Sequence, residues 1–433
     1  MKKKYSKKNI SKLMMEWIKI LFPLNRSIAG PDNYKTLIYL KNHLPNLNIK
    51  YFNSGKKVLD WVVPNEWHIK DAFIKNLNGK RIIDFKKNNL HVVNYSSKID
   101  KIISNKDLQS HLFSIKNFKS AIPYVTSYYK KFWGFCLSEN QRKKLKDKKY
   151  IIKIDSKFVK GKMHYGECFI NSINKKEIFF STNICHPSMA NNELSGPIVL
   201  TALMKWINEI PNKKYSYRAI FIPETIGSIA YISKNKTQMK KNIFMGFNLV
   251  CVGDNAKFSY LPTKDENTIT DKVVEFVFKY YSIKHKKYTF LDRGSDERQY
   301  GSIGINLPIA SIMRSKYGTY KEYHTSKDNL NFISEKGLSG SLEMYKKIII
   351  VIEKNLKYKT TVLDCEPFFT KYNLYPTQST KETFSKVKLT KNIIAYADGN
   401  YDLIDLSRIL KTDFFVLSQN CETLLKKGLL KIV

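Results

Sequence analysis

The sequence predicts an α/β protein built on a mixed, mostly parallel central sheet that is flanked by helices. Between residues 150 and 360, short apolar runs alternate with loops and with stretches of helical periodicity. Continuous apolar runs are typical of strands buried in a parallel sheet. The segments before and after this region differ from it: one is dense in aromatic and β-branched residues, and the other consists of short helical patterns. A chain of 433 residues is long enough for two or three domains.

Four apolar runs are the predicted strands of the central sheet. They are KEIFFST (176–182), YRAIFI (217–222), MGFNLVCVG (245–253) and NLPIASIMR (306–314). Helices are expected near 195–209, 226–234, 268–283 and 336–355, where apolar residues recur at helical spacing. Residues 10–50 are also expected to be helical, with a turn at Gly30-Pro31. We therefore assign residues 1–56 and 150–362 to one discontinuous α/β domain.

The segment 57–149 is predicted to be a small β-rich domain inserted into the first. Its short β-type runs, such as RIIDF and LHVVNY, are separated by turn signals. The aromatic and histidine side chains of this segment have two possible roles. They fill the core of the module, which is the interpretation we favour, or they form a surface that caps a substrate. These rings belong to Trp61, Trp67, His68, His91, Tyr95, Tyr128, Tyr129 and Trp133.

The C-terminal segment 366–433 has the outline of a winged helix-turn-helix, with three short helices and a terminal strand. Residues 389–433 carry six basic and five acidic side chains, and the candidate recognition helix (412–427) is mostly apolar. Recognition helices direct Arg, Lys, Asn or Gln toward base edges. A nucleic-acid partner is therefore not expected. We expect the winged helix to pack against the body or to form a homo-oligomer.

The formal charge of +38 does not by itself indicate a nucleic acid or a membrane surface. Only eight of the 75 basic residues are arginine, the residue that phosphate contacts usually recruit, and lysine is spread along the whole chain. The six cysteines occur singly, without a CxxC pair, which favours a reducing, cytoplasmic location. No stretch approaches the about 20 apolar residues needed to span a bilayer, so no membrane partner is expected.

Side chains that can bind a metal follow each predicted strand. His186 follows the first strand, Glu224 the second, Asp254 the third and His324 the fourth. The carboxyl ends of parallel strands meet at one edge of a sheet, where ligands bind. Each residue alone would more often be a loop or helix-capping residue. Two imidazoles and two carboxylates at one edge are a donor set that suits zinc, so the sequence predicts a metal site.

The loop GSDERQ (294–299) is expected near the same edge, where it would contact a substrate. Arg298 has the planar fork that binds a carboxylate, and Asp296 and Glu297 supply further polar groups. Tyr323, next to His324, completes the predicted substrate-binding set. The alternative is a charged surface loop whose ion pairs contribute little.

These motifs together resemble the zinc aminopeptidases. The resemblance rests on His186 with ANNELSG, Glu224 with ETIGS, Asp254 in VGD, and the GSDERQ and YHTS runs. The whole chain is similar, more closely, to a bacterial aminopeptidase-like family with an inserted β-rich domain and a C-terminal winged helix. Members of that family often belong to gene sets for cell-surface polysaccharides. The closer similarity is carried by DWVVPNEWHIKDAFI (60–74), NLHVVNYS (89–96), IPYVTSYY (122–129) and WGFC (133–136).

The resemblance implies a pair of zinc ions, with manganese or cobalt as alternatives. It places His186 and Asp254 on one ion, and Glu224 and His324 on the other. The peptidases bridge their two ions with an aspartate, and the residue at that position here is the neutral Asn192.

Two departures from the peptidase pattern affect the expected chemistry. A bridge between two dications favours a negative oxygen, so either Glu193 takes the place of Asn192 as a ligand or only one ion binds. The peptidases also have adjacent glutamates, one a base and one a ligand, whereas this chain has Pro223-Glu224. The catalytic carboxylate is therefore expected to be Glu224 or Glu193. If Glu224 is a ligand, the Asp296/Glu297 pair also remains available as the base.

The sequence thus predicts a metal-dependent, aminopeptidase-like hydrolase that cleaves an amide bond. Expected substrates are a small peptide or an N-acyl or aminoacyl group on a polysaccharide precursor. The alternative is a catalytically inactive peptidase fold that acts as a regulator by binding DNA or a protein through its winged helix. Asn192 and the lone Glu224 support this alternative.

Overall fold

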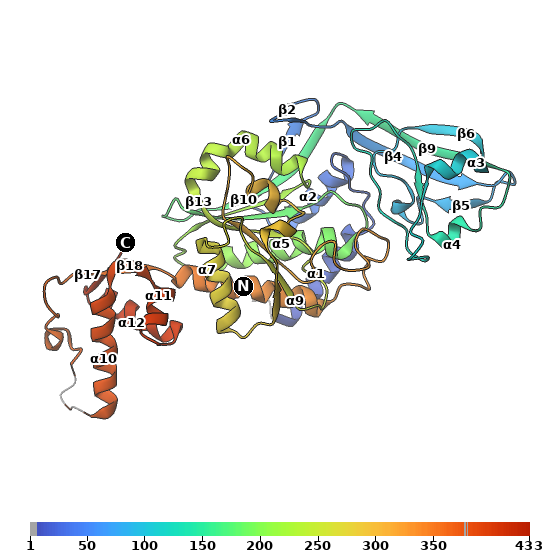
Figure 1. The fold of residues 1–433 in the computed structure, drawn as a ribbon. Helices are drawn as coiled ribbons and strands as arrows, with labels where there is room; N and C mark the ends of the chain where they lie inside the picture. The colour runs from blue at the N-terminus through green and yellow to red at the C-terminus, as the bar shows by residue number, and fades with distance from the viewer. Residues whose placement is uncertain (1–6, 376–377, 379) are drawn as a thin grey trace. The chain divides into compact units, whose positions relative to one another are not determined.

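The computed structural model describes residues 7–375, 378 and 380–433. The chain forms two compact units (Figure 1). The first runs to Lys272 and includes Ile283–Tyr345, and the second comprises Val273–Ser282 and Lys346–Val433. Residues 1–6 of the predicted α/β domain, and residues 376, 377 and 379 of the predicted winged helix, lie outside the described residues.

The first unit is built on an eight-stranded mixed sheet of order β1-β10-β12-β11-β13-β16-β14-β15. The middle strands β12, β11, β13 and β16 are parallel, and β10 and β14 pair with them in the antiparallel sense. The bounds are β1 Leu47–Asn53, β10 Lys162–Ile170, β11 Glu177–Asn183, β12 Ser216–Ile222, β13 Ile243–Leu249, β14 Phe258–Leu261, β15 His285–Lys287 and β16 Ile309–Met313. Strands β11, β12 and β16 are buried at every position, which explains their apolar sequences. The predicted α/β class is confirmed.

Helices cover both faces of this sheet. α5 (Ser195–Glu209) and α6 (Ile226–Asn242) follow neighbouring strands, and their crossovers run in opposite directions along the sheet. Because such crossovers are right-handed, the two helices lie on opposite faces (Figure 1). α1 (Lys7–Leu21) and α2 (Pro31–His43) pack beside α5. The remaining helices that begin in this unit are α7 (Ile269–Tyr280), α8 (Glu297–Tyr300) and α9 (Glu335–Lys354).

The first strand of the sheet was not expected. Residues 10–50 were predicted to be helical, but Leu47–Asn53 forms β1, which pairs antiparallel with β10 along its whole length. The helical prediction for residues 47–50 is wrong. The run LNIKYFN forms an edge strand because it pairs with β10, which lies more than 100 residues further along the chain. A pairing between distant segments leaves no signal in the local sequence pattern.

The inserted module is a four-stranded antiparallel sheet of order β5-β4-β9-β6. Its strands are β4 Glu66–Lys75, β5 Arg81–Asp84, β6 Ile99–Ser104 and β9 Lys149–Val159. Shorter elements are β2 Lys57–Val58, β3 Trp61–Val62, α3 Asn105–Leu108, β7 Leu112–Phe113, β8 Phe135–Cys136 and α4 Glu139–Arg142. Because β9 belongs to this sheet, the insertion continues past the predicted boundary at residue 149.

The aromatic side chains of the insertion divide between core and surface. Trp67 and Tyr95 are buried and stack on each other, as the core interpretation expects. Trp61 and Tyr129 are exposed and form an edge-to-face pair. Most buried apolar side chains of the insertion belong to one hydrophobic core with residues of α6 and of the central sheet. The insertion is therefore packed onto the α/β body.

The second unit contains a winged helix-turn-helix. Its elements are β17 Lys357–Thr360, α10 Lys381–Tyr396, β18 Asp398–Asp402, α11 Leu403–Ile409, α12 Phe414–Lys426 and β19 Leu430–Ile432. The three strands form a small antiparallel sheet of order β18-β17-β19. Since β17 is its central strand, the fold begins before the predicted start at residue 366. None of the described helices combines the length and apolar character that a bilayer crossing requires.

Candidate metal centre

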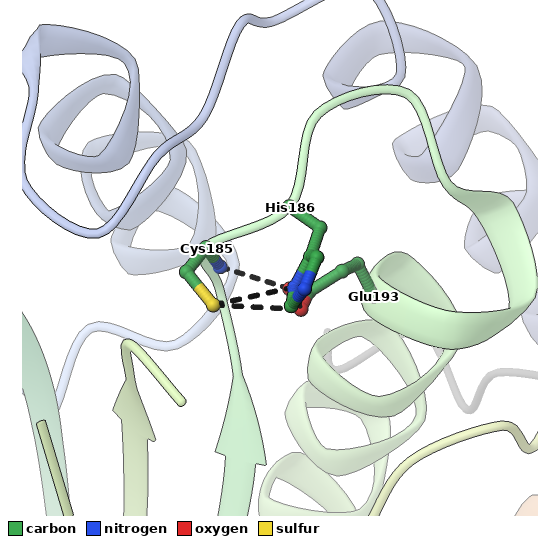
Figure 2. A group of neighbouring side chains, drawn as sticks. All are labelled: Cys185, His186 and Glu193. Atoms are coloured by element: carbon green, nitrogen blue, oxygen red, sulfur yellow. Dashed lines mark hydrogen bonds and ion pairs between the residues drawn. The ribbon is translucent and has the colours of Figure 1, made fainter. Parts of the chain in front are cut away.

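Three buried side chains with metal-binding atoms meet at the carboxyl end of β11 (Figure 2). Cys185 and His186 follow the strand, and Glu193 lies in a single π-helical turn, Ala190–Leu194, that leads into α5. Their ligand atoms lie within 4.8 Å of one another, and no other such group of three occurs among the described residues. The structure thus brings together two predicted residues, His186 and Glu193. It adds Cys185, which the sequence analysis did not single out.

His186 and Glu193 form a buried ion pair. Nδ1 of His186 contacts Oε1 of Glu193, and Oε2 accepts the backbone N–H of Cys185 at 2.8 Å. Burial opposes both charges, yet Glu193 raises the pKa of His186 and His186 lowers the pKa of Glu193. Arg26 is also buried, donates from Nε to the carbonyl of His186 at 3.1 Å, and has its pKa lowered by burial to about 10. The carboxylate is therefore held in its charged, cation-binding form.

The π-helical turn that carries Glu193 is fixed by Asp328. The Asp328 carboxylate accepts the backbone N–H of Asn191 at 2.6 Å and that of Asn192 at 2.9 Å. A π-helical turn inserts an extra residue into a helix and often occurs at a functional site. In this turn, the side chains of Asn192 and Glu193 point in different directions. Glu193 contacts His186, whereas Nδ2 of Asn192 lies 3.5 Å from a ring nitrogen of His324.

His324 faces the group from the loop that follows β16. Its ring centroid lies 5.0 Å from that of His186, and the ring of Tyr323 stacks on it at 3.9 Å. Burial and the nearby His186 lower the pKa of His324 to about 2. The His324 ring is therefore neutral, which is the form that binds a metal. Both predicted residues of the YHTS run lie beside the centre.

Glu224 follows β12, as the sequence predicts. Its backbone N–H donates to Sγ of Cys185 at 3.2 Å, and its Oε1 accepts the hydroxyl of Ser295 at 2.7 Å. Burial raises the pKa of Glu224, and the charge of Glu193 adds to this effect. A carboxylate with a raised pKa is a better proton acceptor near neutral pH than an ordinary glutamate.

Asp254 is not brought into the group. Its two carboxylate oxygens accept four hydrogen bonds of 2.7–3.2 Å from its own surroundings. The donors are the side-chain amide of Asn191, the backbone of Ala256, and the backbone and hydroxyl of Ser315. The chain turns at Cys251, where φ is 53°, before Asp254 is reached. Cys251 itself points toward the site, with Sγ 3.6 Å from Oδ1 of Asn192.

Asp296 and Glu297, two of the predicted substrate contacts, are fully buried. Asp296 accepts hydrogen bonds from the Thr225 backbone at 2.7 Å and from the Ser228 hydroxyl at 2.9 Å. Burial, with the charge of Glu224, raises its pKa to about 8. The structure thus gives Asp296 a positioning role for the turn after Glu224 and leaves neither carboxylate accessible to a substrate.

Arg298 lies at the edge of the site and is only partly buried. One guanidinium nitrogen donates to the hydroxyl of Thr225 at 2.5 Å, while Nε is buried without a hydrogen-bond partner. The partly exposed guanidinium is the cation of the predicted substrate-binding set that lies closest to Glu224 through the turn at Thr225.

The insertion contributes a tyrosine to the site. The chain at Pro123 forms a β-bridge with Thr325, and the backbone N–H of Tyr124 donates to the carbonyl of His324 at 2.8 Å. The Tyr124 ring lies 4.7 Å from that of His186 and 5.4 Å from that of His324. Sequence reasoning missed Tyr124 because its place depends on the pairing of two loops more than 190 residues apart.

A cleft of about 670 Å³ lies between the N-terminal segment of the α/β body and the insertion. Residues 22–35 and residues 85–90 of the insertion line most of it. Ser188 and Ser326, each two residues from a histidine of the site, also line it. A cleft of this size accommodates a substrate larger than a single amino acid.

Comparison with known proteins identifies close relatives along the whole chain. The family model described as a domain of unknown function, DUF4910, matches residues 15–355, and a winged helix-turn-helix model matches residues 356–432. A putative polysaccharide biosynthesis protein with aminopeptidase-like domain from Clostridium acetobutylicum is 40% identical over 417 residues, which are 96% of this chain and 95% of that protein. The crystal structure of a putative peptidase from the same organism is 39% identical, has a TM-score of 0.89, and aligns over 99% of this chain and 98% of its own.

More distant solved structures share the fold. A zinc aminopeptidase from Bacillus subtilis has a TM-score of 0.59 at 13% identity, over 81% of this chain and 96% of its own. A peptidase M28 precursor from Shewanella amazonensis has a TM-score of 0.55 at 10% identity, over 80% of this chain and 96% of its own. The α/β body is therefore aminopeptidase-like in fold. With its family model covering most of the sequence and a 40% identical relative spanning nearly all of it, the chain belongs to the DUF4910 family and carries a C-terminal winged helix-turn-helix.

Proposed function

We propose that this protein is a metal-dependent hydrolase that cleaves an amide bond. The observation that carries the proposal is the buried pair of His186 and Glu193 at the carboxyl end of β11, with Glu224 at the end of the neighbouring strand. The substrate is a small peptide or an N-acyl or aminoacyl group on a precursor of a cell-surface polysaccharide. The name of the Clostridium relative, which refers to polysaccharide biosynthesis, supports the second substrate class.

The residues present fit one zinc ion. His186 and Glu193 would hold it, and the neutral ring of His324 lies beside them. A second ion would lack its carboxylates, because the bridging position is the neutral Asn192 and Asp254 is engaged in four other hydrogen bonds. Manganese and cobalt remain alternatives to zinc.

The proposed mechanism assigns the proton transfers to Glu224. Zinc, when bound, supplies Lewis acidity toward the carbonyl oxygen of the scissile amide. Oε1 of Glu224 is held by the Ser295 hydroxyl, so Oε2 accepts the proton of the attacking water and returns it to the leaving amine. The partly exposed guanidinium of Arg298 binds a carboxylate of the substrate. Tyr124 and Tyr323 flank the reacting bond and restrict the access of water.

Metal content measured together with a substrate screen tests this proposal. Full-length protein purified without chelators should contain about one equivalent of zinc, manganese or cobalt. It should hydrolyse a member of a panel of aminoacyl and N-acyl substrates that includes amidated amino sugars. His186→Ala should lose both metal and activity, whereas His285→Ala, which changes an exposed histidine on β15, should lose neither. A metal content below about 0.5 equivalents in the wild type would refute the site.

A second variant separates catalysis from metal binding. Glu224→Gln should retain the metal and lose about 10²–10⁴-fold in kcat, because it removes the proton acceptor. If Glu224→Gln and His186→Ala both hydrolysed the substrate at the wild-type rate, the activity would not come from this site, and the proposed mechanism would fail. If the wild type hydrolysed no member of the panel, the inactive-peptidase alternative would be favoured.

A further inference from the structure

Cys185 directs its thiol toward the candidate metal centre. It precedes His186 at the end of β11, and Figure 2 shows its sulfur on the side of the Glu193 carboxylate. Sγ lies 3.3 Å from Nδ1 of His186 and 3.6 Å from Oε1 of Glu193. All three residues are buried. The sulfur is thus the third corner of a compact group of donor atoms.

The sulfur distances are those of a tetrahedral site. With a zinc–sulfur distance of about 2.3 Å and zinc–nitrogen and zinc–oxygen distances of about 2.1 Å, the sulfur stands about 3.6 Å from either other donor. Both sulfur distances here agree with that value to within 0.3 Å. The contact between His186 and Glu193 is shorter than these sulfur distances. Binding of a dication would need only the His186 ring and the Glu193 carboxylate to move apart.

Burial, with the charges of Glu193 and Glu224, raises the pKa of the Cys185 thiol well above its ordinary value, so a thiolate forms there only when a cation is bound. The backbone N–H of Glu224 donates to Sγ at 3.2 Å, and hydrogen bonds of this kind orient and tune a metal ligand. Glu193 is in turn fixed by the backbone N–H of Cys185 at 2.8 Å. By contrast, Cys136 and Cys168 are buried but belong to no group of metal-binding side chains among the described residues. Cys185 therefore differs from a cysteine that only fills the core.

We propose that Cys185 is a metal ligand, so that one ion is held by a sulfur, a nitrogen and an oxygen from Cys185, His186 and Glu193. The inference rests on the proposed function and deepens it by naming the donor set. Three protein donors leave a fourth position for water or substrate, which is the arrangement of catalytic zinc sites. Binding releases the thiol proton to solvent. A thiolate also selects thiophilic ions, so zinc, cobalt and cadmium should bind in preference to manganese and magnesium.

Cobalt titration of metal-free, full-length protein tests the sulfur ligand without reference to activity. Cobalt(II) bound by a thiolate has a sulfur-to-metal charge-transfer band in the near ultraviolet, in addition to its visible bands. We expect the near-ultraviolet band to saturate at about one equivalent, as for a single three-donor site. Cys185→Ser should lose that band and bind cobalt at least about 10-fold more weakly. Cys251→Ser, which changes the other cysteine beside the site, should keep the band.

X-ray absorption of the zinc-loaded wild-type protein gives the same answer without a variant, because a sulfur ligand appears at about 2.3 Å. Cobalt bound without the charge-transfer band, or a band that survives in Cys185→Ser, would overturn the sulfur ligand and leave the metal site intact. Failure of the wild type to bind cobalt or zinc would instead overturn the proposed function. If Cys185→Ser did not fold, as judged by circular dichroism, a zinc spectrum without sulfur would still overturn the inference.

Discussion

Glu297 shows how a buried carboxylate close to a candidate active site can hold the surrounding loops in place. It is fully buried, and its two oxygens accept five hydrogen bonds. The donors are the backbones of Gly294 and Ser295, the hydroxyls of Tyr317 and Ser311, and the side-chain amide of Asn248. These contacts tie the loop before α8 to β13 and β16. Glu297 thereby positions Ser295, which holds Glu224.

Glu297→Gln should lower the free energy of unfolding by about 2–4 kcal/mol, because an amide nitrogen then faces donors that a carboxylate oxygen had satisfied. Urea denaturation followed by circular dichroism measures the loss. Glu209→Gln, on the exposed end of α5, is the control and should change stability by less than about 0.5 kcal/mol. A loss below about 1 kcal/mol for Glu297→Gln would contradict the structural role.

The position of a residue after a strand predicted the edge at which it lies but not the direction of its side chain. His186 and Glu224 were located in this way, and both lie at the centre. Asp254 satisfied the same rule, yet the turn at Cys251 leads its carboxylate into a separate hydrogen-bond network. Cys185 was missed because the cysteines were interpreted only as a redox signal. Its adjacency to His186 at a strand end was the available clue.

At the scale of elements, α5 packs so closely against the sheet at Gly196 that no side chain fits there. A Cβ on Gly196 would stand 2.3 Å from the carbonyl oxygen of Leu249 and 2.4 Å from Oγ1 of Thr182. Backbone atoms cannot yield to such contacts without moving the helix. The close approach of α5 therefore fixes the π-helical turn that carries Glu193.

Gly196→Ala should destabilise the protein by about 3 kcal/mol, and it should weaken metal binding because α5 must shift with Glu193 attached. Thermal unfolding and a zinc titration measure the two effects. Ala202→Gly, in the same helix, should cost about 1 kcal/mol through helix propensity and leave zinc affinity unchanged. Wild-type stability in Gly196→Ala would show that α5 is not seated as described.

The register of β1, β10 and β12 places Glu167 among cations. Nζ of Lys50 lies 2.6 Å from its Oε1, Tyr231 donates to its Oε2 at 2.7 Å, and a guanidinium nitrogen of Arg218 lies 3.4 Å from its Oε1. Burial opposes the charge of Glu167, but these partners outweigh it and lower its pKa. The carboxylate therefore stabilises the folded sheet whenever it is ionised.

Glu167→Gln should reduce stability by about 1–3 kcal/mol at pH 7. Because the folded pKa lies below the unfolded value of about 4.3, the contribution of Glu167 is complete above that pH and is lost as the pH falls through the folded pKa. The difference between wild type and variant should thus be constant from pH 7 to pH 5 and shrink at pH 3.5. Urea unfolding at the three pH values measures it, and a difference that grows in acid would contradict the prediction.

The central elements were predictable because burial on both faces makes their sequences continuously apolar. β11 and β12 fall within one residue of their predicted bounds. The edges of modules were less predictable. β9 pairs with β4 and β6 of the insertion, and β17 pairs with β18 and β19 of the winged helix. These strands pair with segments that are distant in the sequence, and a local sequence pattern does not indicate such pairing.

At the scale of the whole molecule, the charge of +38 and the winged helix raise the question of DNA binding. We predict that the winged helix does not provide a specific DNA-binding surface. Arg408 and Lys426 are exposed basic residues of α11 and α12. If DNA binds only through scattered lysines, Arg408→Gln combined with Lys426→Gln should change the affinity for a duplex by less than about twofold, with little sequence preference. Fluorescence anisotropy at two salt concentrations measures this. A loss of more than about tenfold would assign DNA binding to the winged helix.

The insertion leaves and rejoins the α/β body through paired strands, with Asn53 of β1 opposite Lys162 of β10. A recombination event that replaced the module at these two points would preserve the hydrogen bonding of the parent sheet. It would also replace Tyr124, whose ring contacts the rings of His186 and His324. Exchange of this one segment would therefore change the surroundings of the candidate site, while the candidate metal ligands of the α/β body stayed unchanged.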